Sequence, residues 1–239
     1  QILIITNENN LDQFVNLLGD GNKFGLQISY EVQNKPNGIA EAFLIGENFI
    51  KNNDVILILG DNIFNGIDFK KIINLLRSSK FDSIIFSYFV DDPERYGVIK
   101  FNNNSILKLI EKPKKFISNY AITGLYFFDK NVVKIAKKLK PSKRNELEII
   151  DVIKYYYNKK KLVNIPLKTG MAWLDAGTPK SLLQASQLVQ TLQERQRYPI
   201  GSPELTAYKK KLITRKHVVK LINSYNDSEY KNTILNFIK

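Results

Sequence analysis

The amino-acid sequence predicts an α/β fold built on a sheet of parallel or mixed strands. Strand patterns alternate with helical patterns through the first half of the chain, and this rhythm is typical of βαβ units. The apolar run 55–59 then stops at Gly60, and Asp61 follows directly. Because ligands bind beyond the carboxyl ends of such strands, we expect Asp61 at the mouth of a binding crevice.

The first half of the chain supplies the elements of this rhythm. Strand patterns occupy 2–6, 26–32 and 55–59, and apolar residues fall at helical spacing over 11–18 and 39–50. Gly19 ends the first helical pattern, and Pro36 opens a turn before the second. The run 55–59 contains no polar residue, so we expect a strand that is buried on both faces.

The second half of the chain adds antiparallel strands. Helices are predicted over 68–76, 131–139 and 148–157, and strands over 83–88, 97–101, 106–110, 124–128 and 162–167. The strands 97–101 and 106–110 are close enough in the chain to form a hairpin, so we expect a mixed sheet. Asn131 is expected to cap the helix that follows it.

The region after residue 178 has a helical pattern. Apolar residues recur at helical spacing up to residue 192, and further helices are predicted over 203–212 and 214–225, beyond a Pro/Gly break at 199–203. We therefore expect a core domain over residues 1–177 and a helical region over residues 178–239.

The composition excludes several classes of chemistry. The chain of 239 residues has no cysteine and a single histidine, His217, so thiolate nucleophiles, disulfides and cysteine-bound zinc are excluded, and imidazole chemistry is not expected. The net charge of +13 comes from lysines spread over solvated faces and gives little support for nucleic-acid binding. No segment approaches the roughly 18 apolar residues of a membrane span, and no export leader opens the chain. We therefore expect a cytoplasmic protein without membrane contact.

Two carboxylates stand in similar sequence settings. Asp61 follows an apolar run, and Asp175 lies within Trp-Leu-Asp-Ala-Gly-Thr at 173–178. Either aspartate alone could simply cap a turn. If the fold brings them together, their oxygens suit a divalent metal.

Two further motifs are ambiguous on their own. In residues 92–98, Arg95 and Tyr96 precede Gly97, and the plainest interpretation is a loop in which Arg95 pairs with a carboxylate. The triplet Glu-Lys-Pro at 111–113 places opposite charges where proline ends a strand, which is also common on protein surfaces.

Taken together, these segments resemble the glucose-1-phosphate thymidylyltransferases in their order and spacing. The resemblance runs from Gln1 into the helical tail and rests on residues 59–64, 92–98, 111–113, 120–127, 146–149 and 173–178. It implies a Rossmann-like, three-layer mixed sheet and the transfer of a nucleotidyl group from dTTP to glucose 1-phosphate, giving dTDP-glucose for the dTDP-rhamnose route and pyrophosphate. It also implies Mg²⁺ as cofactor and a homotetramer with a regulatory nucleotide site, with which the helical region is compatible.

The resemblance also assigns roles to individual residues. Asp61 and Asp175 match the magnesium ligands, and Lys112 matches the lysine that neutralises the sugar phosphate. The positions that match substrate-binding residues are Gln33 and Gly38 for the nucleoside, Gly97, Glu111 and Ile122 for the hexose, and Asn62, Tyr96 and Trp173 within the same motifs.

Two departures separate this sequence from the family pattern. Asn145 and Ile150 stand where the family has Gly and Thr. The Gly-rich βα segment that opens family members, on the order of 50 residues with an arginine and a lysine for the triphosphate, has no counterpart in the sequence. We therefore expect a sheet without its first strand, unpaired backbone groups between the strands at 2–6 and 55–59, and no activity of this chain alone.

Two other functions are compatible with the sequence. A glycosyltransferase of the same general fold also places aspartates after a buried strand, although the Glu-Lys-Pro triplet at 111–113 argues against it. A non-catalytic module would bind sugar nucleotides or associate with an intact copy. Gln33 suits the edge of a pyrimidine and leaves both thymine and uracil open.

Overall fold

The computed structural model describes residues 1–78, 81–103 and 105–238, which form two compact units. The larger unit comprises residues 35–181, and the smaller unit combines residues 1–34 with residues 182–239. The domain boundary predicted near residue 178 stays a prediction.

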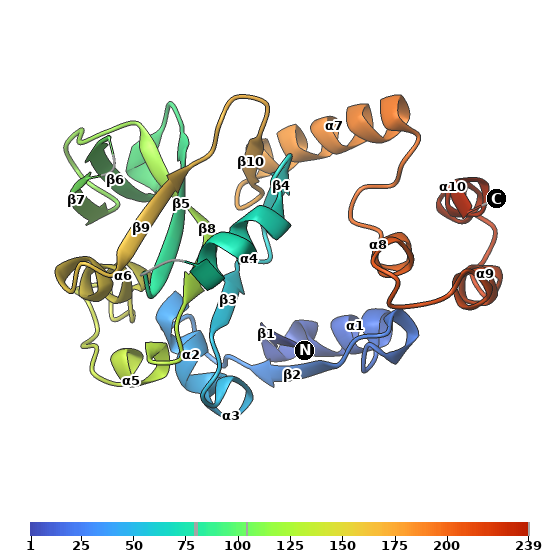
Figure 1. The fold of residues 1–239 in the computed structure, drawn as a ribbon, viewed down its shortest axis with the longest axis horizontal. Helices are drawn as coiled ribbons and strands as arrows, with labels where there is room; N and C mark the ends of the chain where they lie inside the picture. Colours follow the sequence, from blue (N-terminus) through green and yellow to red (C-terminus); the bar gives the residue numbers. More distant parts are fainter. Residues whose placement is uncertain (79–80, 104, 239) are drawn as a thin grey trace. The chain divides into compact units, whose positions relative to one another are not determined.

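A six-stranded mixed sheet forms the centre of the larger unit (Figure 1). Its strands are β3 (Val55–Ile58), β5 (Ser83–Phe89), β6 (Gly97–Asn102), β7 (Ser105–Glu111), β8 (Tyr120–Phe128) and β9 (Leu162–Pro166). Strand order is β7-β6-β8-β5-β9, with β3 paired to β8. Strands β5 and β9 are parallel, whereas β3, β5 and β6 each run antiparallel to β8. The predicted hairpin is confirmed, since β6 pairs with β7.

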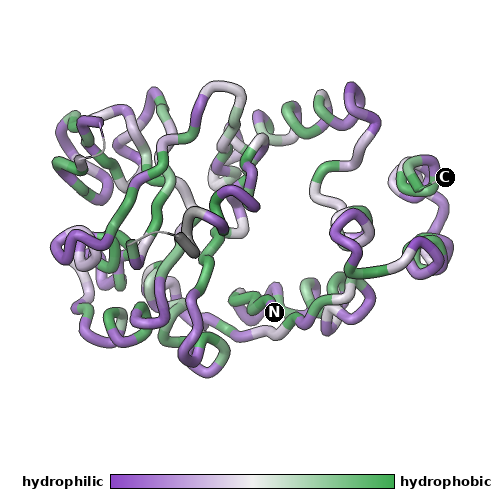
Figure 2. The backbone as a smooth tube through the Cα atoms, in the orientation of Figure 1, coloured by the Kyte–Doolittle hydropathy of each residue, from purple (hydrophilic) through white to green (hydrophobic). Residues whose placement is uncertain are grey.

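Helices cover both faces of this sheet and make it the middle of three layers. The helices of the unit are α2 (Ala42–Ile45), α3 (Glu47–Ile50), α4 (Phe69–Ser78), α5 (Val132–Ala136) and α6 (Ile149–Asn158). One face packs Ile85 and Phe128 against α2, α5 and α6, and the other packs Phe86 and Leu125 against Ile72 of α4. The strands that make these contacts carry long hydrophobic stretches (Figure 2). The α/β prediction with a mixed sheet is therefore confirmed.

A separate two-stranded ribbon, β4 (Asn62–Asn65) with β10 (Ala172–Asp175), lies beyond the end of β3. The strands are antiparallel, and Asp175 pairs in register with Asn62. Strand β4 was not predicted, because only three residues separate it from β3 and its own pattern is half polar. This pairing brings two segments more than a hundred residues apart in the chain to the same place.

The smaller unit contains a parallel strand pair and a group of helices. The pair is β1 (Ile2–Thr6) with β2 (Ile28–Val32). The helices are α1 (Glu8–Leu18), α8 (Pro203–Lys209), α9 (Arg215–Asn223) and α10 (Glu229–Ile238). Helix α7 (Pro179–Gln196) begins in the larger unit and has most of its residues in the smaller one. Phe24, Leu205, Ile222 and Ile234 form its core. The helix over 229–238 was not predicted. No described helix is both long and apolar enough to cross a membrane.

Three local predictions are wrong. Strand β3 is not buried on both faces, since Ile56 and Ile58 are 44% and 50% exposed and, within the described residues, β3 pairs with β8 alone. Asn131 does not cap α5, because its backbone is already helical and its side chain donates to Asp129 instead. The helical pattern over 39–50 is divided into two short helices at Gly46.

Candidate active site

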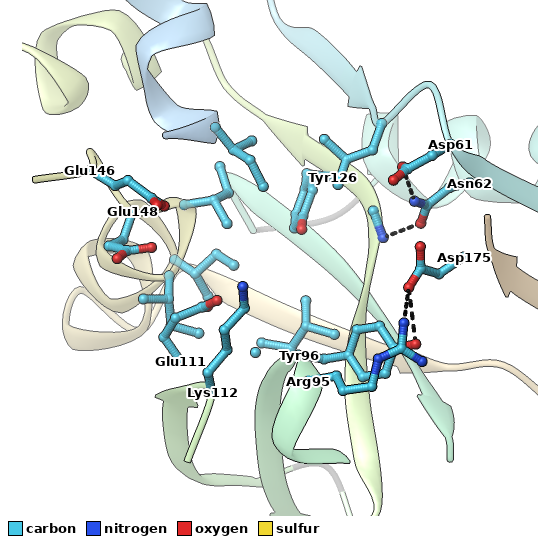
Figure 3. Close-up of a pocket in the computed structure, with 18 of the residues that line it drawn as sticks. Asp61, Asn62, Arg95, Tyr96, Glu111, Lys112, Tyr126, Glu146, Glu148 and Asp175 are labelled. Carbon is cyan, nitrogen blue, oxygen red and sulfur yellow. Dashed lines mark hydrogen bonds and ion pairs between the residues drawn. The ribbon is translucent and has the colours of Figure 1, made fainter. Parts of the chain in front are cut away.

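Most of the predicted site residues line one cavity of the larger unit (Figure 3). The cavity has a volume of about 250 Å³, and its charged lining residues are Asp61, Arg95, Glu111, Lys112, Arg144, Glu146, Glu148 and Asp175. Figure 3 shows the two aspartates at one end of the cavity and the three glutamates at the other, with the Lys112 side chain extending between them. A ligand that fills the cavity would therefore meet two separate groups of charges.

Asp61 and Asp175 converge at the first end. The pairing of β10 with β4 sets the two segments side by side, and the Ala176 amide donates to the Asp61 carbonyl oxygen at 2.8 Å. A methyl group added at Gly177 would lie 2.7 Å from Asp175 Oδ1 and 3.4 Å from Asp61 Oδ2. Oxygens of both carboxylates thus border one small space that a side chain at Gly177 would fill. The predicted juxtaposition of the two aspartates is present in the structure.

Asn62 holds the Asp61 side chain in place. Its amide nitrogen donates to Asp61 Oδ1 at 2.7 Å. Its amide oxygen accepts from the Gly124 backbone at 2.9 Å and from Trp173 Nε1 at 2.6 Å. These contacts use both the nitrogen and the oxygen of the Asn62 amide. Asn62, held by Trp173, therefore fixes the orientation of the Asp61 side chain.

Arg95 and Tyr96 both contact Asp175. Arg95 Nη2 lies 3.1 Å from Asp175 Oδ2, and Nη1 lies 2.8 Å from Asp92, so the predicted pairing of Arg95 with a carboxylate is confirmed twice over. The Tyr96 hydroxyl donates to the same Asp175 oxygen at 3.1 Å. Burial, together with the Asp175 charge and hydrogen bond, raises the pKa of Tyr96 to about 12. Tyr96 therefore stays a hydrogen-bond donor at physiological pH.

Gly97, Glu111 and Ile122 form one wall of the cavity. Gly97 pairs in register with Glu111, and a methyl group added at Gly97 would lie 3.1 Å from Glu111 Oε2 and 3.5 Å from Ile150 Cδ1. Glycine at this position therefore leaves the backbone open to a ligand, where a side chain would be crowded. Burial and then the nearby Glu148 charge raise the pKa of Glu111 above its usual range.

Lys112 and Arg144 supply positive charge near the glutamates. Lys112 has a backbone φ of 39°, in the left-handed region that non-glycine residues seldom adopt, and its amide donates to the Tyr96 carbonyl oxygen at 2.9 Å. Arg144 Nη2 lies 2.7 Å from Glu148, 3.3 Å from Glu146 and 3.8 Å from Glu111. Burial favours a raised pKa at Glu148, but hydrogen bonds from Arg144 and Ser142 outweigh it and lower the pKa.

Sequence reasoning did not place Arg144 and Glu148 in the site. The available signal was the Glu-Leu-Glu-Ile motif that begins one residue after Asn145. Asn145 has a φ of 59°, which explains why glycine suits this position and why asparagine, which tolerates the left-handed region, can replace it.

Two predicted nucleoside-binding residues do not line the cavity. Gln33 belongs to the smaller unit and Gly38 to the larger one. Gly38 has a φ of 102°, and a methyl group added there would clash with the backbone of Leu147. Its glycine is therefore needed for close backbone packing beside the segment that carries Arg144, and its role toward a nucleoside stays a prediction.

The α/β sheet carries convergent carboxylates and cations in one cavity, and open α/β sheets bind their ligands in such crevices. Comparison with known proteins agrees. The sequence model of the nucleotidyl transferase family matches residues 1–191. A glucose-1-phosphate thymidylyltransferase of Neisseria meningitidis is 41% identical over all 239 residues, which cover 83% of its length, and one of Mycobacterium tuberculosis is 40% identical over the same shares.

Solved structures give the same result. A protein of Bacillus anthracis described as a candidate glucose-1-phosphate thymidylyltransferase superposes with a TM-score of 0.73 at 39% identity, covering 79% of this chain and 75% of its own. A UDP-glucose pyrophosphorylase bound to UDP-glucose shares the fold, with a TM-score of 0.67 at 24% identity over 80% of this chain and 81% of its own. This chain belongs to the nucleotidyl transferase family, and its resemblance to the glucose-1-phosphate thymidylyltransferases is confirmed.

Proposed function

We propose that the site of this chain serves the transfer of a thymidylyl group from dTTP to α-D-glucose 1-phosphate, giving dTDP-glucose and pyrophosphate, and the expectation that this chain alone is inactive stays a prediction. One observation carries the proposal: a single cavity places a carboxylate pair at one end and a lysine beside glutamates and a glycine wall at the other. The first end suits a cation with phosphates, and the second suits a hexose phosphate. The names of the relatives support the same reaction.

The carboxylate pair fits a divalent cation, and we propose Mg²⁺. Asp61 and Asp175 offer hard oxygen ligands around the space that a side chain at Gly177 would fill. Two carboxylates suffice for Mg²⁺, because this ion keeps several waters and takes further ligands from substrate phosphates. The described residues contain no group of three or more acidic, histidine or cysteine side chains that would form an all-protein cage. When bound, the ion would neutralise phosphate charge.

The remaining residues position the sugar phosphate. A phosphate oxygen of glucose 1-phosphate attacks the α-phosphorus of dTTP, and the bond from that phosphorus to the pyrophosphate oxygen breaks. Lys112 is placed to neutralise the attacking phosphate, and Glu111 is placed to accept hydrogen bonds from hexose hydroxyls against the Gly97 backbone. No covalent enzyme intermediate is needed, in agreement with a chain that lacks cysteine.

The finer assignments are part of the same proposal. We assign Gln33 and Gly38 to the nucleoside, Ile122 to the hexose, and Tyr96 and Trp173 to the wall that separates hexose and cation. Tyr96 and Trp173 support this wall by an edge contact between ring centroids 5.2 Å apart. A homotetramer is expected from the resemblance alone.

Titration calorimetry with dTDP-glucose tests the proposal, with pyrophosphate release from dTTP and glucose 1-phosphate measured in parallel. Lys112→Gln should weaken binding by about tenfold or more, because it removes a charge-assisted contact to phosphate. Asp175→Asn should lower any pyrophosphate release by about 10²-fold or more.

Asp151→Asn is the matched control, because Asp151 pairs with Lys154 on α6 and does not line the cavity. We expect it to behave like the unchanged chain. Absence of dTDP-glucose binding would contradict the proposal. Binding without pyrophosphate release, together with stable association with an intact copy, would favour the non-catalytic module.

A further inference from the structure

Asp175 already has a cation as partner. Its Oδ1 accepts from the Gly177 amide at 2.7 Å, and its Oδ2 accepts from both Arg95 and Tyr96 at 3.1 Å. The Asp175 side chain is only 14% exposed, so little of it is open to solvent. A divalent ion that binds Asp175 must approach beside the guanidinium of Arg95.

Arg95 is held from two sides. Its Nη1 contacts Asp92 at 2.8 Å, and Asp92 does not line the cavity. Its guanidinium carbon also lies 5.1 Å from the centre of the Tyr96 ring. If Arg95 loses its contact with Asp175, it still has Asp92 as a carboxylate partner outside the cavity and the Tyr96 ring as a stacking surface. The charge of Arg95 therefore stays compensated.

We propose that Arg95 is the built-in counter-ion of Asp175 and sets the cation affinity of the site. Arg95 neutralises the converging carboxylates while no cation is present and competes with the cation for Asp175 Oδ2. Free divalent ions then bind weakly, and strong binding requires additional negative charge from the phosphates of a nucleotide. This inference rests on the cation site in the proposed function.

The expected size of the effect follows from Coulomb's law. In a water-like dielectric, the repulsion between a divalent ion and a neighbouring unit charge is on the order of tenfold in affinity. Removal of the Arg95 charge should therefore tighten the binding of a free divalent ion by about tenfold.

Binding of Mn²⁺ alone, measured by electron paramagnetic resonance on the purified chain, tests this inference without any need for turnover. Arg95→Gln should tighten Mn²⁺ binding by about tenfold, whereas Arg95→Lys, which keeps the charge, should stay within about twofold of the unchanged chain. Lys154→Gln removes the same charge from an ion pair on α6 outside the cavity and should change nothing. Circular dichroism of each variant checks folding.

Asp175→Asn separates the inference from the proposed cation site. If Asp175→Asn abolishes Mn²⁺ binding and Arg95→Gln leaves it unchanged or weaker, the counter-ion inference is overturned and the cation site stands. If Asp175→Asn leaves Mn²⁺ binding unchanged, the cation site itself is wrong and the inference falls with it. Tightening by Arg95→Lys as large as by Arg95→Gln would also overturn the inference, because the effect would then not follow charge.

Discussion

Each unit has a glutamate at least partly withdrawn from solvent, Glu204 in the smaller unit and Glu111 in the larger one, and the two differ in their partners. Glu204 of the smaller unit is 4% exposed, and its carboxylate accepts hydroxyl hydrogen bonds from Tyr225 at 2.8 Å, Ser202 at 2.9 Å and Tyr230 at 2.5 Å. Glu111 of the larger unit has Arg144 as its ion-pair partner among the described residues, 3.8 Å away and shared with Glu146 and Glu148.

This difference separates a structural carboxylate from one available to a ligand. Glu204 uses its oxygens to join α8, the segment that follows α9, and α10, so its network contributes to the fold and offers nothing to a substrate. Glu111 is partly buried and has no equivalent set of hydrogen bonds within the described part of the chain, and its pKa is raised for that reason. Its unused acceptor capacity faces the cavity, where hexose hydroxyls would complete it. Glu111 thus lowers the stability of the fold at the site, whereas Glu204 contributes to stability in the smaller unit.

The largest effect is expected at Glu204. Glu204→Ala leaves the Tyr225 and Ser202 hydroxyls without their acceptor and leaves Tyr230 with Ser202 as acceptor, and it should lower the free energy of unfolding by about 3 kcal/mol. Glu194→Ala, at an exposed position of α7, is the control and should cost less than about 0.5 kcal/mol. Urea unfolding followed by circular dichroism measures both, and equal effects would remove the contrast between the two glutamates.

Glu111 and Glu148 should respond to neutralisation with opposite signs. The pKa of Glu148 is lowered, so its charge stabilises the fold at neutral pH and this contribution is lost as pH falls through the folded pKa. Glu148→Gln should therefore cost about 2 kcal/mol at pH 7 and progressively less below about pH 4.

The pKa of Glu111 is raised by folding. The protonated carboxyl therefore contributes to the free energy of unfolding fully below its unfolded pKa, and this contribution is lost as pH rises through the folded pKa. Glu111→Gln should therefore stabilise the chain by about 1 kcal/mol at pH 7 and by nothing near pH 4. Thermal melts of both variants at the two pH values test the signs. Destabilisation by Glu111→Gln at pH 7 would show that Glu111 is structural.

A smaller effect is expected from alkaline titration of the Glu204 network. Burial and the hydrogen bond to Glu204 raise the pKa of Tyr225 well above its usual range. The contribution of Tyr225 to the free energy of unfolding is therefore complete below about pH 10 and is lost as pH rises through the folded pKa. Near pH 11 the loss should be about 1 kcal/mol. Unfolding of Tyr225→Phe between pH 9 and pH 11 should have a flatter pH dependence than the unchanged chain. A parallel dependence would exclude Tyr225 as its source.

The sequence by itself determined the local elements and the family. Strands such as β5 and β8 and helices such as α6 follow from the spacing of apolar residues along short segments. The ordered motifs around Asp61, Lys112 and Asp175 were sufficient for the resemblance that the comparisons confirm. These features are encoded within a few residues of one another, so they can be recognised without a three-dimensional structure.

Only the tertiary structure decided which side chains meet. The β4–β10 pairing that sets Asp175 beside Asp61, the contact of Arg95 with Asp175 and the contact of Arg144 with Glu111 all join distant segments. The exposure of Ile56 likewise depends on what covers β3 rather than on its own apolar pattern. Periodicity reports which face of an element avoids water, whereas ion pairs and strand partners depend on how separate elements pack against each other.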